Sequence, residues 1–316
     1  MASRRPAAAL ISFAPLAAVA VTVLAWASAF VAIRWVGRSY EPGPLALGRL
    51  LVGTVGMGVP LALRRAWVRP TRREWLLVAL CGAAWFAVYT VALNAAERRV
   101  DAGTTAMLVN IGPILIALMA GVLLGEGFPR WLLIGAAVAF TGAVLIGLAT
   151  AGASGGGADL IGVLLCVVAA VTYATGVLAQ KPVLRRLSGL QLTWLACAVG
   201  AAVCLPFLPR LVEQVAEAPA GATWGVIYLG LVPTALAFST WAYALARTNA
   251  GRLGVSTYLV PPLTIGMSAL LLGEVPPVVA VLGGAVCLVG VGLSRRGSAP
   301  RRSERRRRDR PSAPVR

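Results

Sequence analysis

The sequence has no histidine and few charged residues, since only 13% of its 316 residues are Asp, Glu, Lys or Arg. Histidine is the commonest acid–base group and metal ligand at neutral pH. The 11 carboxylates fall between apolar runs, at their ends, or in the C-terminal tail. A membrane enzyme needs acid–base or metal groups at membrane depth. We therefore predict that the protein is not an enzyme and needs no metal or cofactor.

Cysteine is also scarce, and no two cysteines form a CxxC pair. All five lie inside apolar runs, where cysteine behaves as a small hydrophobic residue. We predict that they pack in the interior and form neither disulfides nor metal sites. They are Cys81, Cys166, Cys197, Cys204 and Cys287.

Hydrophobic residues dominate, at 59% of the chain, and they occur in long uninterrupted runs. About 20 apolar residues are needed for a helix to cross a hydrocarbon core of roughly 30 Å. The sequence therefore predicts an all-α integral membrane protein with ten transmembrane helices. The predicted spans are 14–33, 44–63, 75–95, 104–124, 131–149, 160–179, 190–208, 223–244, 253–272 and 277–293.

The first run has a second interpretation, as a signal peptide. Arg4 and Arg5 precede it, and Ala25-Trp26-Ala27 resembles a signal-peptidase site. Its apolar part is too long for a signal, and it has a counterpart later in the chain. We therefore interpret it as a span.

Basic residues outnumber acidic ones by 29 to 11, and their distribution predicts the orientation. With loops assigned alternately to two sides, 23 Lys and Arg residues share the side of both termini, five lie opposite, and Arg49 falls inside a span. Cytoplasmic loops carry the excess of positive charge. We predict a multi-pass protein of the cell membrane with both termini in the cytoplasm.

The last 21 residues, 296–316, are Arg-rich and have no apolar periodicity, which predicts a disordered cytoplasmic tail. We interpret the tail as a topology anchor. Anionic lipid heads and nucleic acid are alternative partners for it. A second copy of the chain, as a homodimer, is a further candidate partner.

Two segments of the chain resemble each other at a spacing of 148 residues. IGPILIALMAGVLLGE at 111–126 aligns without a gap on LVPPLTIGMSALLLGE at 259–274, so that Pro113 meets Pro261 and Glu126 meets Glu274. The spacing covers five spans, an odd number, so the second copy enters the membrane from the opposite side. We predict two inverted five-helix repeats, 1–150 and 151–295, as in secondary transporters.

The two prolines interrupt apolar helices at the same register. Proline removes a backbone donor, and irregular backbone at membrane depth is tolerated where it is buried in protein or lines a polar cavity. A cavity at Pro113 and Pro261 is one interpretation, and simple packing kinks are the other. Asn110 and Tyr258 each lie three residues before their proline and are the first pair of candidate substrate contacts.

Trp26 and Tyr173, which align at a spacing of 147, form a second candidate pair. Each side chain can pack and also donate a hydrogen bond. Helix packing is the alternative role for any of these aromatics. Weaker candidates on the third and eighth spans are Tyr89, Thr90, Asn94 and Trp241.

The doubled segment resembles a known family. AERRVDAGTTAMLVNIGPILIALMAGVLLGE and ALARTNAGRLGVSTYLVPPLTIGMSALLLGE are similar to the two signature segments of EamA-type proteins of the drug/metabolite transporter superfamily. WASAFVAIRWVG followed by PLALGRLLVG resembles the family's opening spans. The resemblance covers the chain to about residue 295. It implies ten helices in two inverted halves and export or exchange of small metabolites, such as amino acids or drug-like compounds.

The sequence therefore predicts a secondary transporter that works by alternating access, with a non-transporting membrane scaffold as the alternative. The sequence places no carboxylate near the centre of a span, so proton antiport through an intramembrane Glu lacks its residue. Glu126 and Glu274 follow glycines and are interpreted as helix-end residues, with a role as titrating gates as the alternative. Coupling by exchange, by facilitated diffusion or by a proton on the substrate stays open.

Arg49 is the only charged residue predicted well inside a span. Arginine at a helix centre costs about 2.5–3.5 kcal/mol on insertion scales. It can reach the interface with its long side chain, or it can point inward. In the second case an unpaired guanidinium favours substrates that carry a carboxylate or phosphate. We expect Arg49 to bind the acid group of an anionic or zwitterionic metabolite.

Overall fold

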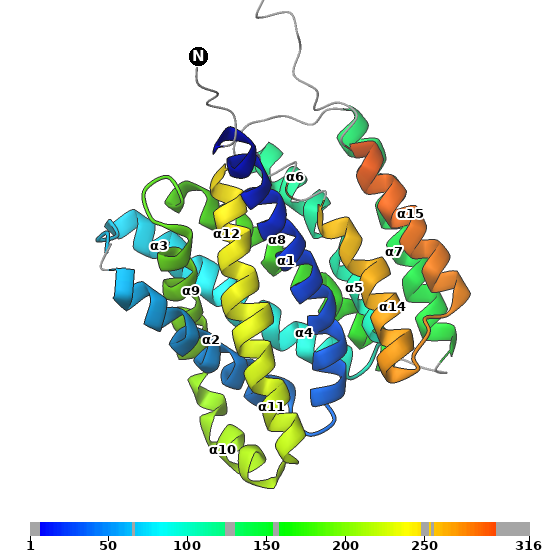
Figure 1. The fold of residues 1–316 in the computed structure, drawn as a ribbon. Helices are drawn as coiled ribbons and strands as arrows, with labels where there is room; N and C mark the ends of the chain where they lie inside the picture. The colour runs from blue at the N-terminus through cyan, green and yellow to red at the C-terminus, as the bar shows by residue number, and fades with distance from the viewer. Residues whose placement is uncertain are drawn as a thin grey trace, which may run out of the picture.

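A computed structural model describes residues 7–64, 67–123, 130–153, 158–247, 253 and 256–294. Every regular element among these residues is a helix (Figure 1). The helices of the first half are α1 (Ala7–Val36), α2 (Pro42–Arg64), α3 (Arg72–Cys81), α4 (Tyr89–Glu97), α5 (Ala102–Val109), α6 (Gly112–Leu123) and α7 (Arg130–Ala153). Those of the second half are α8 (Ala158–Val183), α9 (Gly189–Cys204), α10 (Leu208–Glu217), α11 (Ala220–Leu229), α12 (Ala237–Arg247), α14 (Val260–Leu272) and α15 (Val278–Ser294).

Short stretches of other helix types join some of these segments. The π-helix η1 (Gly82–Val88) connects α3 to α4, and the π-helix η3 (Gly230–Leu236) connects α11 to α12. Two 3₁₀ turns, η2 (Leu205–Phe207) and η4 (Thr257–Leu259), precede α10 and α14. π-Helical stretches frequently occur at functional sites. The residues in and around η1 and η3 are therefore candidates for a functional site.

Within the described residues, six helical segments are long and apolar enough to cross a membrane, which agrees with an integral membrane protein. They are Ala14–Val36, Pro42–Arg64, Arg72–Glu97, Leu160–Val183, Gly189–Glu217 and Ala220–Arg247. Four shorter apolar helices, Ala102–Ile116, Leu133–Gly142, Val260–Leu272 and Val281–Gly290, fall in the other predicted spans. The count of ten crossings stays a prediction.

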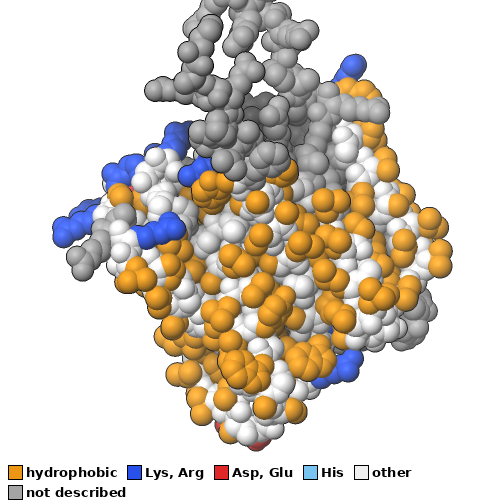
Figure 2. All heavy atoms as spheres, in the orientation of Figure 1, with side chains coloured by type: hydrophobic (Ala, Val, Ile, Leu, Met, Phe, Trp, Pro, Cys, Tyr) orange, Lys and Arg blue, Asp and Glu red, His pale blue; other side chains and the backbone are white. Residues whose placement is uncertain are grey.

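The outer surface of the bundle is apolar. Leu63, Leu270 and Val278 are among its most exposed side chains, and Figure 2 shows hydrophobic side chains across the middle of one face with Lys and Arg towards its ends. Such a surface is unfavourable in water, where large apolar patches mark interaction or membrane sites. It suits lipid, which requires the backbone polar groups to be satisfied inside the helices.

The two ends of the bundle are distinguished by their connections. Residues 37–41 join α1 to α2 at one end, which we call the α1–α2 end, and residues 65–71 join α2 to α3 at the opposite, α2–α3 end (Figure 1). The start of α1 and the last turn of α15 both lie at the α2–α3 end. The Arg-rich tail and Glu126 lie outside the described residues.

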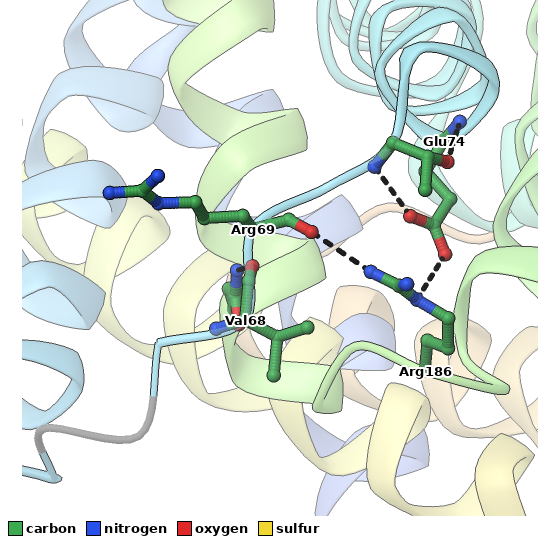
Figure 3. A network of polar contacts seen from close by, with 6 residues as sticks. Val68, Arg69, Glu74 and Arg186 are labelled. Atoms are coloured by element: carbon green, nitrogen blue, oxygen red, sulfur yellow. Dashed lines mark hydrogen bonds and ion pairs between the residues drawn. The ribbon is translucent and has the colours of Figure 1, made fainter.

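A polar network fixes the connection at the α2–α3 end (Figure 3). Glu74 and Thr71 form a capping box at the start of α3. Arg186 bonds Glu74 at 3.0 Å and donates to the Arg69 carbonyl at 2.9 Å. Gln191 donates to the Val68 carbonyl at 2.6 Å and accepts from the Val68 amide at 3.2 Å. These bonds attach the segment that precedes α3, and the start of α3 itself, to the turn between α8 and α9.

Helices α7 and α15 pack side by side at one edge of the bundle (Figure 1). A Cβ on Gly142 would lie 2.5 Å from the Gly283 carbonyl oxygen, and one on Gly290 would lie 2.6 Å from that of Gly135. Glycine permits this close helix approach. Gly135 and Gly283 are repeat mates at the 148-residue spacing, as are Gly142 and Gly290, so each contact repeats the other with the two helices exchanged.

Candidate functional site

A small cavity lies at the centre of the bundle, where the interrupted helices meet. Its volume is about 50 Å³. Its walls come from α1, η1, the start of α4, α5, α6, α8, α12, η4 and α14. The lining residues are Trp26, Phe30, Trp85, Tyr89, Ala106, Val109, Asn110, Pro113, Tyr173, Phe238, Thr257 and Val260.

Aromatic rings form most of the wall. Trp85 is 1% exposed, and its ring centroid lies 5.1 Å from Tyr173 and 4.9 Å from Phe238. Trp26 lies 5.4 Å from Phe238 and 5.0 Å from Trp241. Edge-to-face and tilted pairs at these separations are favourable. The rings therefore support each other and present both faces and edges to the cavity.

Asn110 connects the two helix interruptions across the cavity. It lies in the turn between α5 and α6, and its side-chain amide donates to the main-chain carbonyl of Thr257 at 2.8 Å. Thr257 lies four residues before Pro261, so its carbonyl lacks the usual helical donor. The Val260 amide also donates to this oxygen in the 3₁₀ turn. The two interruptions thus share one hydrogen-bond network at the cavity wall.

Two polar atoms at the cavity are buried and have no hydrogen-bond partner in the part of the chain that the structure describes. They are the indole nitrogen of Trp26, a donor, and the amide oxygen of Asn110, an acceptor. Buried polar groups in native proteins are nearly always bonded. One donor and one acceptor facing an aromatic cavity would satisfy a small polar ligand.

Arg49 lies on α2 behind this cavity and does not line it. The residue is 4% exposed, and its Nε donates to the Thr234 hydroxyl at 3.1 Å. That hydroxyl donates in turn to the Leu229 carbonyl at 2.8 Å, the group that Pro233 leaves without a helical donor. Nη1 of Arg49 is buried and without a hydrogen-bond partner among the described residues. Tyr89, which lines the cavity, lies within electrostatic range of Arg49.

The burial of Arg49 decides whether its side chain reaches the membrane interface or points into the bundle. A snorkelling side chain would extend to the surface, whereas this guanidinium ends inside the bundle against η3. A Cβ on Gly230 would lie 2.8 Å from the Arg49 carbonyl oxygen, so glycine allows α2 and η3 to approach closely. The structure places the Arg49 side chain inside the bundle but not in the wall of the cavity.

A second, polar pocket of about 300 Å³ lies at the α1–α2 end. Arg34, the basic residue of the last turn of α1, donates from Nε to both Glu274 oxygens at 3.0 and 3.1 Å. Its Nη1 donates to the main-chain carbonyl of Glu97. Arg38 and Arg98 also line the pocket. This arrangement connects α1, α4 and the end of α14.

Glu97 is the residue that sequence reasoning missed. The third span was predicted to end at residue 95, which put Glu97 in a loop, but α4 extends to Glu97 and the side chain is fully buried. Neither carboxylate oxygen has a hydrogen-bond partner in the described part of the chain. A carboxylate at the end of a predicted span is therefore buried and does not lie in a loop. The available signal was Asp101, an N-cap residue that marks the start of the next helix. A short turn before Asp101 lets the preceding helix extend to Glu97.

The structure brings five of the sequence-predicted residues to one cavity, namely Trp26, Asn110, Pro113, Tyr173 and the weaker candidate Tyr89. Pro261 is buried at the start of α14 but is not part of the wall. The side chain of Tyr258 lies outside the described residues. Sequence reasoning missed Trp85 and Phe238, because the repeat spacing pairs them with Pro233 and Thr90 and gives no aromatic match.

A helical bundle with an apolar outer surface, interrupted central helices and buried charges has the features of an integral membrane transporter. The model of the EamA-like transporter family matches residues 13–148 and again 160–296. The chain belongs to this family and is a membrane transporter.

Several relatives are similar over most of their length. One, from Streptantibioticus cattleyicolor, is named "Probable terminal-alkyne amino-acid exporter" and is 40% identical over 292 residues, 91% of this chain and 95% of the relative. An uncharacterized transporter of Bacillus subtilis, YdfC, is 31% identical over 268 residues, 84% of this chain and 86% of its own. A protein of known crystal structure superimposes with a TM-score of 0.61 at 20% identity, over 90% of this chain and 96% of its own. This last likeness concerns the fold alone.

Proposed function

We propose that the protein exports small amino acids with short, apolar or unsaturated side chains by alternating access. The observation that carries the proposal is the central cavity, whose aromatic wall includes the Trp26 N–H and the Asn110 oxygen, both without a hydrogen-bond partner within the described chain. A zwitterion needs a donor for its carboxylate and an acceptor for its ammonium group. The relative named as an amino-acid exporter supports the same class of substrate.

The aromatic wall matches the remaining parts of such a substrate. Ring faces attract ammonium groups, and rings also pack against an unsaturated side chain. A cavity of about 50 Å³ is small beside the roughly 300 to 1,000 Å³ of drug-sized sites. The size favours a small amino acid over a bulky drug, with further space arising when the helices move.

Arg49 has a proposed role at longer range. Its Nη1, which has no hydrogen-bond partner among the described residues, and its electrostatic interaction with the cavity residue Tyr89 support a field that favours the carboxylate end of the substrate. Direct contact with the acid group requires a rearrangement that brings the guanidinium past Tyr89. We propose that Arg49 stabilises the bound carboxylate and that Pro113 and Pro261 set the helix breaks that frame the site.

We infer an architecture of ten spans in two inverted five-helix halves, residues 1–150 and 151–295, followed by an Arg-rich tail at 296–316. The reciprocal contacts of Gly142 with Gly283 and of Gly290 with Gly135 support a two-fold relation between the halves. The two separate family matches support a duplication. Two halves of equivalent packing can rock about a central site, which is the basis of alternating access.

We propose that the α2–α3 end, with both termini, faces the cytoplasm. The loops assigned to that end carry 23 of the 29 Lys and Arg residues, and the α1–α2 end carries five. The α1–α2 end would then face outward, with the Arg34 pocket at the outer mouth. Reporter fusions after residues 70 and 155 should report cytoplasm and exterior, and the reverse result would contradict this orientation.

Transport in proteoliposomes tests the substrate class. Vesicles that contain the purified full-length protein and unlabelled propargylglycine should take up labelled propargylglycine by exchange. Its N-acetyl and methyl ester derivatives, each of which lacks one charge, should compete at least about tenfold less well, since each charged hydrogen bond contributes about 1.5–3 kcal/mol. Equal competition by both derivatives would contradict zwitterion recognition. Absence of exchange for every amino acid tested would favour the scaffold alternative.

A further inference from the structure

The pocket at the α1–α2 end holds a carboxylate that the substrate site does not use. Glu97 is completely buried, and both of its side-chain oxygens lack a hydrogen-bond partner within the described residues. The neighbouring acids are occupied. Asp101 accepts from the Thr104 amide at 2.9 Å as the N-cap of α5, and Glu274 accepts twice from Arg34. Glu97 alone in this group has no donor for its charge.

The charged and titratable groups around Glu97 come from every neighbouring element. They are Arg34 on α1, Arg38 after it, Tyr89 on α4, Arg98 and Asp101 before α5, Cys166 on α8 and Glu274 after α14. Arg34 bonds the Glu274 carboxylate and the main-chain carbonyl of Glu97. Its charge also acts on the Glu97 carboxylate at longer range, so one arginine, already paired with Glu274, is a cation available to both carboxylates.

An ionised carboxylate that is buried without a donor is strongly disfavoured, and it either takes up a proton or acquires a cationic partner. The exposed side chains of Arg38 and Arg98 line the same pocket as Glu97, so water can deliver a proton there. When Glu97 is neutral, Arg34 is free to hold Glu274 and so attaches α1 to the end of α14. When Glu97 loses its proton, it competes for Arg34 and weakens that attachment.

The same helices carry the substrate cavity. Trp26 and Phe30 of α1 and Val260 of α14 line it, and Thr264 of α14 bonds the Ala27 carbonyl at 3.3 Å. A change at the Arg34–Glu274 pair therefore acts on two walls of the cavity. We propose that Glu97 is a proton-binding site whose occupancy closes the α1–α2 end and couples substrate export to proton movement. The coupling to export rests on the proposed transport function.

Transport under a pH gradient tests this coupling. Proteoliposomes of phosphatidylethanolamine and phosphatidylglycerol with an acidic interior should accumulate labelled propargylglycine about tenfold per pH unit, if one proton exchanges for one substrate. Exchange at equal pH should become faster as the pH rises. In Glu97→Gln, accumulation should disappear, and the remaining exchange should be slower and independent of pH. Persistence of both pH effects in this variant would overturn the proposal.

Two further variants separate proton binding from folding. Glu97→Asp keeps a carboxylate and should keep a pH-dependent exchange. Glu213→Gln removes an exposed carboxylate that pairs with Arg210 at the same end of the bundle, and it should behave as the unsubstituted protein. Loss of pH dependence in both variants would show that Glu97 is not the specific proton site.

A structural measurement decides the proposal without any substrate. Spin labels at Ser39→Cys and Val275→Cys would report the separation between the end of α1 and the end of α14. The distance should increase between acidic and alkaline pH, and Glu97→Gln should abolish the change. A distance that does not depend on pH would overturn the inference even if transport is found. Failure of transport with a pH-dependent distance would overturn the substrate assignment instead.

Discussion

Two arginine–glutamate pairs lie at opposite ends of the bundle, and each joins the first half of the chain to the second. Arg34 on α1 pairs with Glu274 after α14, and Glu74 on α3 pairs with Arg186 before α9. Both pairs have a nitrogen–oxygen distance of 3.0 Å. The two ion pairs therefore have the same length and differ in their surroundings.

At the α2–α3 end both members of the pair also bond other groups. Arg186 is half exposed and also bonds a main-chain carbonyl, and Glu74 caps its own helix. At the α1–α2 end Arg34 and Glu274 are each about three-quarters buried, and a third group, Glu97, lies buried without a donor. Water screens the Arg186–Glu74 pair through its half-exposed arginine, although the Glu74 side chain is only 12% exposed, so this pair contributes little. The Arg34–Glu274 pair lies beside a third carboxylate, so its state can change with the protonation of Glu97.

The largest expected effect follows from removing Arg34. Arg34→Leu removes the cation that pairs with Glu274 and the donor to the Glu97 main-chain carbonyl, which should lower the stability by about 2–3 kcal/mol, between the values for exposed and buried pairs. Thermal unfolding in detergent and exchange in vesicles would measure this, and exchange should fall at least about tenfold. The double variant Arg34→Leu/Glu274→Gln should regain part of the stability. An unchanged melting temperature would mean that the Arg34–Glu274 pair contributes no more to stability than the pair at the opposite end.

A smaller effect is expected at Arg49, the buried arginine between the two ends. Arg49→Gln removes the charge while the amide can still donate to Thr234, so packing of α2 against η3 should persist. If the field of Arg49 stabilises the substrate carboxylate, KM should increase about tenfold, equal to about 1.4 kcal/mol, with little change in the melting temperature. Arg49→Lys should recover most of the affinity. A loss of stability with unchanged KM would assign Arg49 to packing alone.

Two buried asparagines, one at the cavity and one near the α1–α2 end, allow the contribution of the cavity to substrate exchange to be tested. Asn110 donates to Thr257 at the cavity, and Asn94 donates to the Pro42 carbonyl near the α1–α2 end at 3.0 Å. Alanine at either position removes one buried hydrogen bond and should cost about 1 kcal/mol of stability. Only Asn110→Ala should also reduce propargylglycine exchange, by about fivefold. Equal exchange rates in the two variants would remove Asn110 from the substrate site.

Sequence reasoning predicted much of the helical framework, because apolar runs of membrane length and recurring prolines are local signals. It also brought Trp26, Asn110, Pro113 and Tyr173 to attention through the repeat. It could not predict the aromatic contacts of Trp85 and Phe238, which depend on packing between distant helices. Glu97 was missed because the third span was predicted to end at residue 95, whereas α4 continues to residue 97. This difference of two residues moves Glu97 from a loop to a buried position.

The smallest expected effect is at Arg186, which completes the comparison of the two pairs. Arg186→Ala removes the ion pair with Glu74 and one bond to the Arg69 carbonyl, while the Thr71–Glu74 capping box and the Gln191–Val68 bonds still hold the loop. Exposed ion pairs contribute little, so the melting temperature should change by no more than about 2 °C. Exchange of propargylglycine and its dependence on pH should both be unchanged. A pH response altered as strongly as in Arg34→Leu would mean that burial of the neighbouring carboxylate does not distinguish the two ends.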